Sequence, residues 1–264
     1  IDPHGPLLDD WGLSDDAAGA ERMGREVIAA SAGVAACVKP QIAFFERFGS
    51  AGYVALERVL ADAREAGVLV IADVKRGDIG SSFAAYADAW LTPGSPLEAD
   101  AMTVAAYQGF GSLSGAFSHV RDHGKGLFVL GATSNPEARE VQQAVRADGR
   151  TVAQAMVDDA LAFESPLDTH VNSIGVVLGA TLTLAEFGID VTLPPAKPAL
   201  PVLAPGFGHQ GARIEDAGRT FGGLGWALLA NESRSVLSGG ARGLADRVRD
   251  RSDTIATALT PGAN

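Results

Sequence analysis

Short apolar runs recur along this chain with room for a helix between one run and the next, and this alternation constrains the fold more than any other feature. The runs are rich in Val, Leu, Ile and Ala, and they are apolar at odd and even positions alike. That pattern is typical of parallel strands that helices cover on both faces. The seven runs span residues 34–38, 68–74, 101–105, 126–131, 174–179, 200–204 and 226–230. They predict an α/β fold with a parallel sheet.

Helix-like segments occupy the intervals, at 51–66, 81–91, 113–123, 152–163 and 244–259. Gly67, Gly111, Gly124 and Gly188 stand where such helices should end, and the proline-rich stretch 194–201 is expected to be a loop. Eight strand–helix units would close a (β/α)8 TIM barrel, and 264 residues are about its usual size. We therefore predict one barrel domain over residues 1–264.

The unit that is missing from the count is expected at the front of the chain. Ile1 and Asp2 would then be the last residues of strand 1, truncated at the N-terminus, and residues 15–32 would form its helix. On this interpretation the natural chain extends by roughly 10–20 residues before Ile1, the length of a strand with its lead-in.

Charge and cysteine content exclude several classes of protein. The formal net charge is −11, which repels polyanions and disfavours nucleic-acid binding, so an anionic substrate would need a local positive site. The one cysteine, Cys37, lies in an apolar stretch, where we expect a small core residue and no intrachain disulfide. A lone thiol fits a cytoplasmic protein. No run of about 18 apolar residues predicts a membrane span.

The most informative segment ends the second apolar run. Asp73 and Lys75 are two residues apart, so their side chains share a face of an extended strand, and Asp78 follows after a glycine turn. Charges at the inner end of a hydrophobic strand are costly unless they are paired or solvated, and in a barrel the carboxyl ends of strands build the active site. The alternative is a structural salt bridge plus a helix cap made by Asp78 or Ser81.

Four other segments place polar groups after predicted strands. Lys39 ends the first run, although it could be a surface lysine whose stem packs on apolar neighbours. Ser134 lies after the fourth run, where an ordinary turn is the alternative. The glycine-rich loop 205–211 and Arg234 follow the last two runs. Those are the usual phosphate positions of such barrels, although a mobile turn and a surface ion pair would also explain them.

Taken together these segments resemble orotidine 5'-phosphate decarboxylase, in the version of its second bacterial subgroup. The resemblance spans the chain and keeps the order of the motifs. They are Ile-Asp-Pro-His at 1–4, Lys-Pro-Gln-Ile-Ala-Phe-Phe-Glu at 39–46, Asp-Val-Lys-Arg-Gly-Asp-Ile-Gly at 73–80, Thr-Ser-Asn-Pro at 133–136, Pro-Gly-Phe-Gly-His-Gln-Gly at 205–211 and Ser-Arg at 233–234.

The resemblance implies a lyase of pyrimidine biosynthesis. It would convert orotidine 5'-monophosphate into uridine 5'-monophosphate (UMP) and CO2 without a metal or cofactor, as the final step of de novo pyrimidine nucleotide synthesis. Lys39 would hold a ribose hydroxyl and Asp73, Asp73 would face the substrate carboxylate, and Lys75 would protonate C6. Asp78, with Ile79 and Ser82, would reach the site of the partner in a homodimer.

The resemblance also assigns residues that hold the nucleotide. Asp2 would contact the ribose and Ser134 the pyrimidine edge. Pro205 and Gln210 would belong to a loop that closes over base and phosphate, and Arg234 would hold the phosphate.

The chain departs from the family pattern at three places. Residues 104–107 read Val-Ala-Ala-Tyr, where the family often has Asn-Pro-Tyr. Ala212 replaces a glycine, and Glu232 stands close to the proposed phosphate arginine. These departures concern residues that would bind the substrate and not the catalytic charges.

The residue types suit the chemistry, because loss of CO2 from C6 leaves a carbanion that a fixed ammonium can stabilise and then protonate. Three alternatives remain open. A metal-dependent sugar-phosphate decarboxylase or hexulose-phosphate synthase on the same barrel would lose activity in EDTA. A Schiff-base aldolase would need a depressed lysine pKa, whereas two carboxylates should raise it. A non-catalytic nucleotide-binding barrel would release no CO2.

Overall fold

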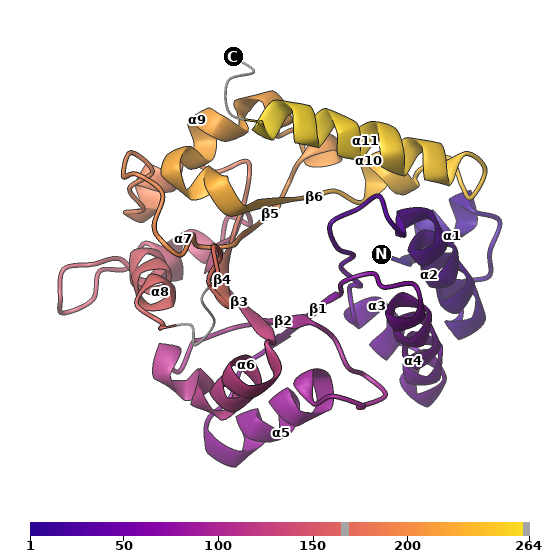
Figure 1. The fold of residues 1–264 in the computed structure, drawn as a ribbon, viewed down its shortest axis with the longest axis horizontal. Helices are drawn as coiled ribbons and strands as arrows, with labels where there is room; N and C mark the ends of the chain where they lie inside the picture. The colour runs from indigo at the N-terminus through magenta and orange to yellow at the C-terminus, as the bar shows by residue number, and fades with distance from the viewer. Residues whose placement is uncertain (165–168, 261–264) are drawn as a thin grey trace. The chain divides into compact units, whose positions relative to one another are not determined.

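Six parallel strands form the sheet of this α/β chain, and they lie in the order in which they follow one another in sequence. The computed structural model describes residues 1–164 and 169–260. The strands are β1 (Ile71–Arg76), β2 (Ala101–Val104), β3 (Gly126–Ala132), β4 (Ile174–Leu178), β5 (Val202–Pro205) and β6 (Leu228–Asn231), in sheet order β1-β2-β3-β4-β5-β6. Figure 1 shows this succession along the colour ramp.

Helices separate the strands. The α-helices are α1 (Gly5–Asp10), α2 (Ala17–Ser31), α3 (Ala43–Glu46), α4 (Gly49–Glu65), α5 (Gly80–Leu91), α6 (Phe117–His123), α7 (Ala138–Gln142), α8 (Val152–Leu161), α9 (Ala217–Phe221), α10 (Arg234–Leu237) and α11 (Leu244–Leu259). The 3-10 helices are η1 (Phe110–Ala116), η2 (Leu184–Phe187), η3 (Gly208–Gln210), η4 (Ile214–Asp216) and η5 (Gly222–Ala227). None of the helices in the described residues has the length and hydropathy that a membrane crossing requires.

The contacts of the chain fall into two compact units. The first unit comprises Ile1–Val74, Tyr86–Met102 and Ser233–Thr254, and the second comprises Lys75–Ala85, Thr103–Glu232 and Ile255–Asn264. The division runs through β1 and β2, so each unit is described by itself. That residues 1–264 form one domain stays a prediction.

The second unit is built around fully buried central strands. All five residues of β4 are buried, and β4 pairs in parallel with β3 on one side and β5 on the other. Gly175 is required in β4 because a Cβ there would clash with the backbone oxygen of Pro201. Helix α8 packs against β3 and β4 and buries Met156, Val157 and Ala160. Its N-terminus is capped by Thr151, whose Oγ1 accepts a hydrogen bond from the Gln154 N–H at 2.9 Å.

The first unit packs α2 on α4 and places an extended segment beside β1. Gly24 lets the two helices approach closely, since a Cβ there would meet the Val59 side chain at 2.6 Å. Val38 and Gln41 form isolated parallel bridges with Val70 and Asp73. The segment that ends in Lys39 therefore occupies the place of a neighbouring strand.

The predicted strands 68–74, 101–105, 126–131, 174–179, 200–204 and 226–230 are confirmed with ends shifted by up to three residues. The strand predicted at 34–38 is wrong. Val34 and Ala35 donate backbone hydrogen bonds to Ser31 at the end of α2, so only Val38 reaches β1. Trp226 belongs to η5 and not to β6, and Gly111 lies within η1 instead of ending a helix. Gly67, Gly124 and Gly188 end their helices as expected.

Candidate active site

Two side chains of the first unit, those of Lys39 and Gln41, contact the Asp73 carboxylate near the carboxyl end of β1. Lys39 Nζ donates to Asp73 Oδ2 at 2.7 Å, and Gln41 Nε2 donates to the same oxygen at 2.8 Å. The Lys39 and Asp73 side chains are only 11% and 8% exposed. A carboxylate so far removed from water needs charge-assisted donors of this kind, and removing one partner of such a pair costs about 3–5 kcal/mol. The structure thus brings together two of the predicted site residues, Lys39 and Asp73.

Asp2 lies beside the same extended segment. The Ile1 N–H group donates to Lys39 O at 2.9 Å, and Gln41 N–H donates to Ile1 O at 2.9 Å, an alternation typical of parallel neighbours. Burial raises the pKa of the Asp2 carboxyl, whereas the Lys39 ammonium and a hydrogen bond from the Ser233 hydroxyl lower it.

Lys75, two residues beyond Asp73 in β1, belongs to the second unit. Its side chain is exposed. Its backbone has φ = 46°, and it is the one non-glycine residue with positive φ within the described ranges. Its N–H group donates to Thr103 Oγ1 at 2.9 Å. The β1 strand thus leaves regular geometry at the predicted proton donor.

The turn after Lys75 packs tightly on the end of β2. Ala105 N–H donates to Arg76 O at 2.8 Å, and a Cβ on Gly77 would clash with the Ala105 carbonyl. Half-buried Asp78 follows, and its Oδ1 accepts from the Ile79 N–H at 2.8 Å. A helix-capping side chain accepts from an N–H two or three residues further along, so this bond is not the cap of α5, and it leaves the second carboxylate oxygen of Asp78 for another partner.

Ile79 and Ser82 are both exposed at the start of α5. Ile79 keeps 60% of its surface accessible. The structure describes one chain, so their predicted reach into a partner's site stays a prediction.

Ser134 lies in the loop after β3 and is exposed. Gln142 fixes this loop through two hydrogen bonds. Its Oε1 accepts from Thr133 N–H at 2.8 Å, and its Nε2 donates to Thr133 Oγ1 at 2.9 Å. Thr133 Oγ1 in turn donates to Asn135 Oδ1 at 2.8 Å. A fixed loop with an exposed serine is suited to binding a ligand edge.

Pro205 is the last residue of β5, and Gln210 belongs to the tight loop that follows it. Gly206 has φ = 121°, a conformation open to glycine and rarely to other residues. Ala212 N–H donates to Gly206 O at 3.1 Å, and Gly208 N–H donates to Ala212 O at 3.0 Å, which closes the loop on itself. Gln210 is exposed at its tip. Ala212 takes part through backbone atoms, so its methyl group does not prevent the loop from forming.

Arg234 begins α10 in the first unit. Its guanidinium is exposed and makes no ion pair with any residue that the structure describes. The Oγ of the neighbouring Ser233 is buried, and this hydroxyl helps to lower the pKa of the Asp2 carboxyl.

Two residues of this geometry were not assigned from the sequence. Gln41 is two residues from Lys39 in an extended segment, so a shared face was readable. Thr103 is the one polar residue of β2, and a buried polar side chain in an apolar strand signals a hydrogen bond that matters.

Metal binding has no visible candidate in the described part of the chain. Among residues 1–164 and 169–260, no group of three or more His, Cys, Asp or Glu side chains is placed to hold an ion.

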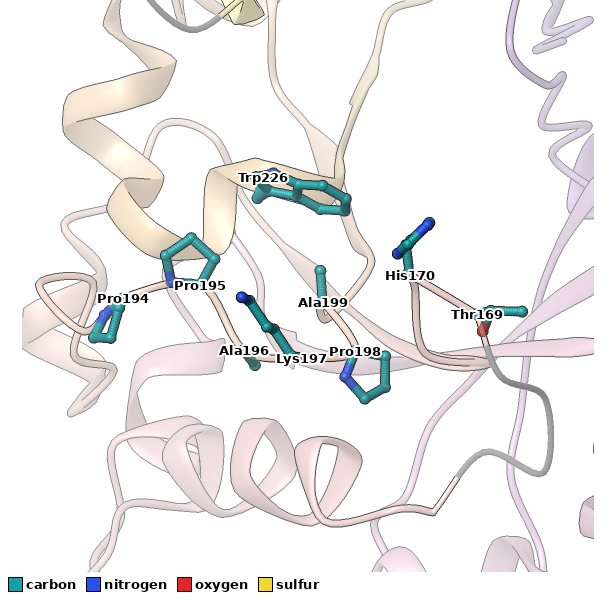
Figure 2. Close-up of a pocket in the computed structure, with 9 residues that line it drawn as sticks. All are labelled: Thr169, His170, Pro194, Pro195, Ala196, Lys197, Pro198, Ala199 and Trp226. Carbon is teal, nitrogen blue, oxygen red and sulfur yellow. The ribbon is translucent and has the colours of Figure 1, made fainter.

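A cavity of about 640 Å³ lies elsewhere in the second unit (Figure 2). Its lining residues precede β4, β5 and β6, at the amino ends of these strands. They are Thr169, His170, Pro194, Pro195, Ala196, Lys197, Pro198, Ala199 and Trp226. None of them is a predicted site residue.

Comparison with known proteins gives one consistent result. The profile of the orotidine 5'-phosphate decarboxylase / HUMPS family matches residues 20–231. The chain is 48% identical to the orotidine 5'-phosphate decarboxylase of Corynebacterium efficiens over 244 residues, covering 91% of this chain and 84% of that protein. It is 49% identical to that of Streptomyces coelicolor over 241 residues, with 91% and 84% covered.

Solved structures agree. A protein of Streptomyces avermitilis, provisionally named orotidine 5'-phosphate decarboxylase, superposes with a TM-score of 0.89 at 48% identity, covering 98% of this chain and 89% of that one. The OMP decarboxylase of Leishmania donovani gives a TM-score of 0.70 at 29% identity, with 92% and 90% covered. The chain belongs to the orotidine 5'-phosphate decarboxylase / HUMPS family.

Proposed function

We propose that this chain decarboxylates orotidine 5'-monophosphate to uridine 5'-monophosphate and CO2, the last step of de novo pyrimidine nucleotide synthesis. The relatives of nearly half identity carry the name of this enzyme. The observation that carries the proposal is the end of β1. There a buried Lys39–Asp73 pair is followed two residues later by Lys75 with an exposed side chain.

The chemistry requires a cation at C6 of the pyrimidine. When the C6–CO2 bond breaks, its electron pair stays on C6, and no neighbouring carbonyl delocalises it. In this proposal the Lys75 ammonium stabilises that charge and transfers a proton to C6, and the products are UMP and CO2. In this proposal Asp73 faces the substrate carboxylate, and Asp78 of the partner subunit completes the same site.

The phosphate is far from the bond that breaks, yet its binding can drive loop closure and so contribute to the rate. We assign it to Arg234, whose planar guanidinium suits a bidentate contact. Pro205 and Gln210 form the closing loop, and Ser134 hydrogen-bonds the pyrimidine edge. Asp2 and Lys39 hold the ribose hydroxyls.

The finer features of the fold and assembly are part of the same proposal. The parallel strands belong to a (β/α)8 barrel that assembles as a homodimer. Asp78, Ile79 and Ser82 of one subunit complete the site of the other. We place this enzyme in the cytoplasm and assign it no metal or cofactor.

The test is to add orotidine 5'-monophosphate to the purified protein with EDTA present and to follow the ultraviolet absorbance and the CO2 released. We expect turnover that EDTA leaves unchanged. Absence of turnover with and without added divalent metal would refute the proposal. Turnover of a sugar phosphate that is lost in EDTA would instead support the metal-dependent branch with the same Asp-x-Lys-x-x-Asp motif.

A further inference from the structure

The backbone of Lys75 adopts a conformation that a lysine rarely takes. Its φ of 46° is in the left-handed region, where the Cβ of an L-residue crowds its own backbone. Residues in such conformations persist only when their surroundings hold them, and they cluster at functional sites. The question is which group in the second unit holds Lys75.

The neighbouring strand β2 supplies that group. The hydroxyl of Thr103 accepts the hydrogen bond of the Lys75 N–H at 2.9 Å, and Thr103 is only 1% exposed. In a regular parallel ladder a backbone carbonyl would accept this N–H. The threonine Oγ1 takes its place at the residue where β1 leaves regular geometry.

The residues after Lys75 are held by the same stretch of chain. Arg76 O accepts from Ala105 N–H at 2.8 Å, and Gly77 lies so close to the Ala105 carbonyl that no Cβ fits. Thr103 and Ala105 thus fix the path on both sides of Lys75. Threonine has a stiff χ1 angle, so its buried hydroxyl is a rigid acceptor.

We propose that Thr103 is a positioning residue for the reaction: its hydroxyl holds the Lys75 backbone in the left-handed conformation that aims the ammonium at C6. This inference rests on the proposed function. Thr103 does not touch the substrate in this account. It acts through Lys75, and none of the family motifs in this chain includes Thr103.

The experiment compares Thr103→Val with Thr103→Ser in the full-length protein. Valine keeps the shape and removes the acceptor, whereas serine keeps the acceptor and removes a methyl group. We expect Thr103→Val to lower kcat by about 10- to 100-fold, because a shift of about 1 Å in a catalytic group costs roughly 100-fold. Affinity for UMP should stay within about threefold in both variants, since phosphate and base contacts remain. Thr103→Ser should keep kcat within about threefold of wild type.

The matched control is Thr151→Val, which removes another hydroxyl that accepts a backbone N–H, at the cap of α8. We expect lower stability but unchanged kcat. If Thr103→Val does not fold, Thr103→Ala and Thr103→Ser are compared, because this pair differs in the hydroxyl alone.

Three outcomes separate the claims. Turnover by wild type with an unchanged kcat in Thr103→Val overturns the inference and leaves the proposed function standing. Equal loss of kcat in the serine and valine variants also overturns it, because the hydroxyl would then not be the cause. Absence of turnover in wild type refutes the proposed function itself.

Discussion

The two ends of the strands in the second unit differ in kind. At the carboxyl ends stand Lys75, Ser134 and Pro205, each on a backbone segment that is fixed by specific hydrogen bonds. The cavity of about 640 Å³ lies at the amino ends of β4 to β6, and Figure 2 shows Trp226, Lys197 and His170 in its lining. Lys197 and His170 are exposed and form no ion pair with the described residues.

The difference is in how the charged groups are held. A cavity of about 640 Å³ is large enough for a nucleotide, but the Lys197 and His170 side chains that line it are exposed. At the carboxyl ends Lys75 keeps a strained backbone conformation. In the first unit, Asp73 keeps a buried charge beside Lys39. Such costs are expected where groups are organised in advance for a reaction.

The strongest test of this contrast is Lys75→Ala, with Lys197→Ala as the matched loss of a lysine at the amino ends. We expect Lys75→Ala to lower kcat by at least about a thousandfold, because it removes the electrostatic stabilisation and the proton donor together. Affinity for UMP, measured by calorimetry, should stay within about tenfold. Lys197→Ala should match wild type. Substantial turnover by Lys75→Ala would show that another group is the acid.

The second test asks whether the carboxyl-end site is shared between subunits. If Asp78 serves the partner's site, Lys75→Ala and Asp78→Ala homodimers are both nearly inactive. Mixing equal amounts makes about half of the dimers mixed, each with one site that has both wild-type residues. Activity after subunit exchange should therefore return to about a quarter of wild type. No recovery, with exchange verified by mass spectrometry, would place Asp78 in its own subunit's site.

The sequence predicted the existence of the six strands better than it predicted their ends. Apolar runs located β1 to β6, but their ends depend on hydrogen bonds that hydropathy does not encode. The run 34–38 was as apolar as the others, yet Val34 and Ala35 bond to the end of α2. The pairing of Lys39 with Asp73 was expected from the family resemblance, and the structure contains it.

The parts that were missed depend on backbone geometry and on contacts distant in sequence. No local sequence pattern predicts that Lys75 has a positive φ. The hydrogen-bond partner of its N–H group, Thr103, is 28 residues away in sequence. Gln41 was readable as a neighbour of Lys39, but its bond to Asp73 required the register of the two segments. The cavity at the amino ends is lined by three segments that are distant in sequence, and no local pattern predicts that they meet.

The third test sharpens the comparison at the phosphate. Arg234→Ala should lower kcat/KM by about 10- to 100-fold, the value of a charge-assisted contact. With the substrate lacking its phosphate, added phosphite should partly restore turnover in wild type and less in the variant. Equal response of both proteins to phosphite would reject the phosphate role of Arg234.

The smallest effect is expected at the amino ends, for Trp226→Ala. Trp226 is 58% exposed, lies in η5 and lines the cavity at the amino ends. Its removal should lower the free energy of unfolding by roughly 1 kcal/mol, as for a partly exposed side chain outside the core. It should leave kcat and KM within about twofold of wild type, because no group that we assign to the reaction depends on it. Steady-state kinetics and thermal unfolding of the same preparation give both numbers. A loss of kcat/KM beyond about tenfold in a folded Trp226→Ala protein would mean that the amino-end cavity takes part in turnover, and the contrast between the two ends would fail.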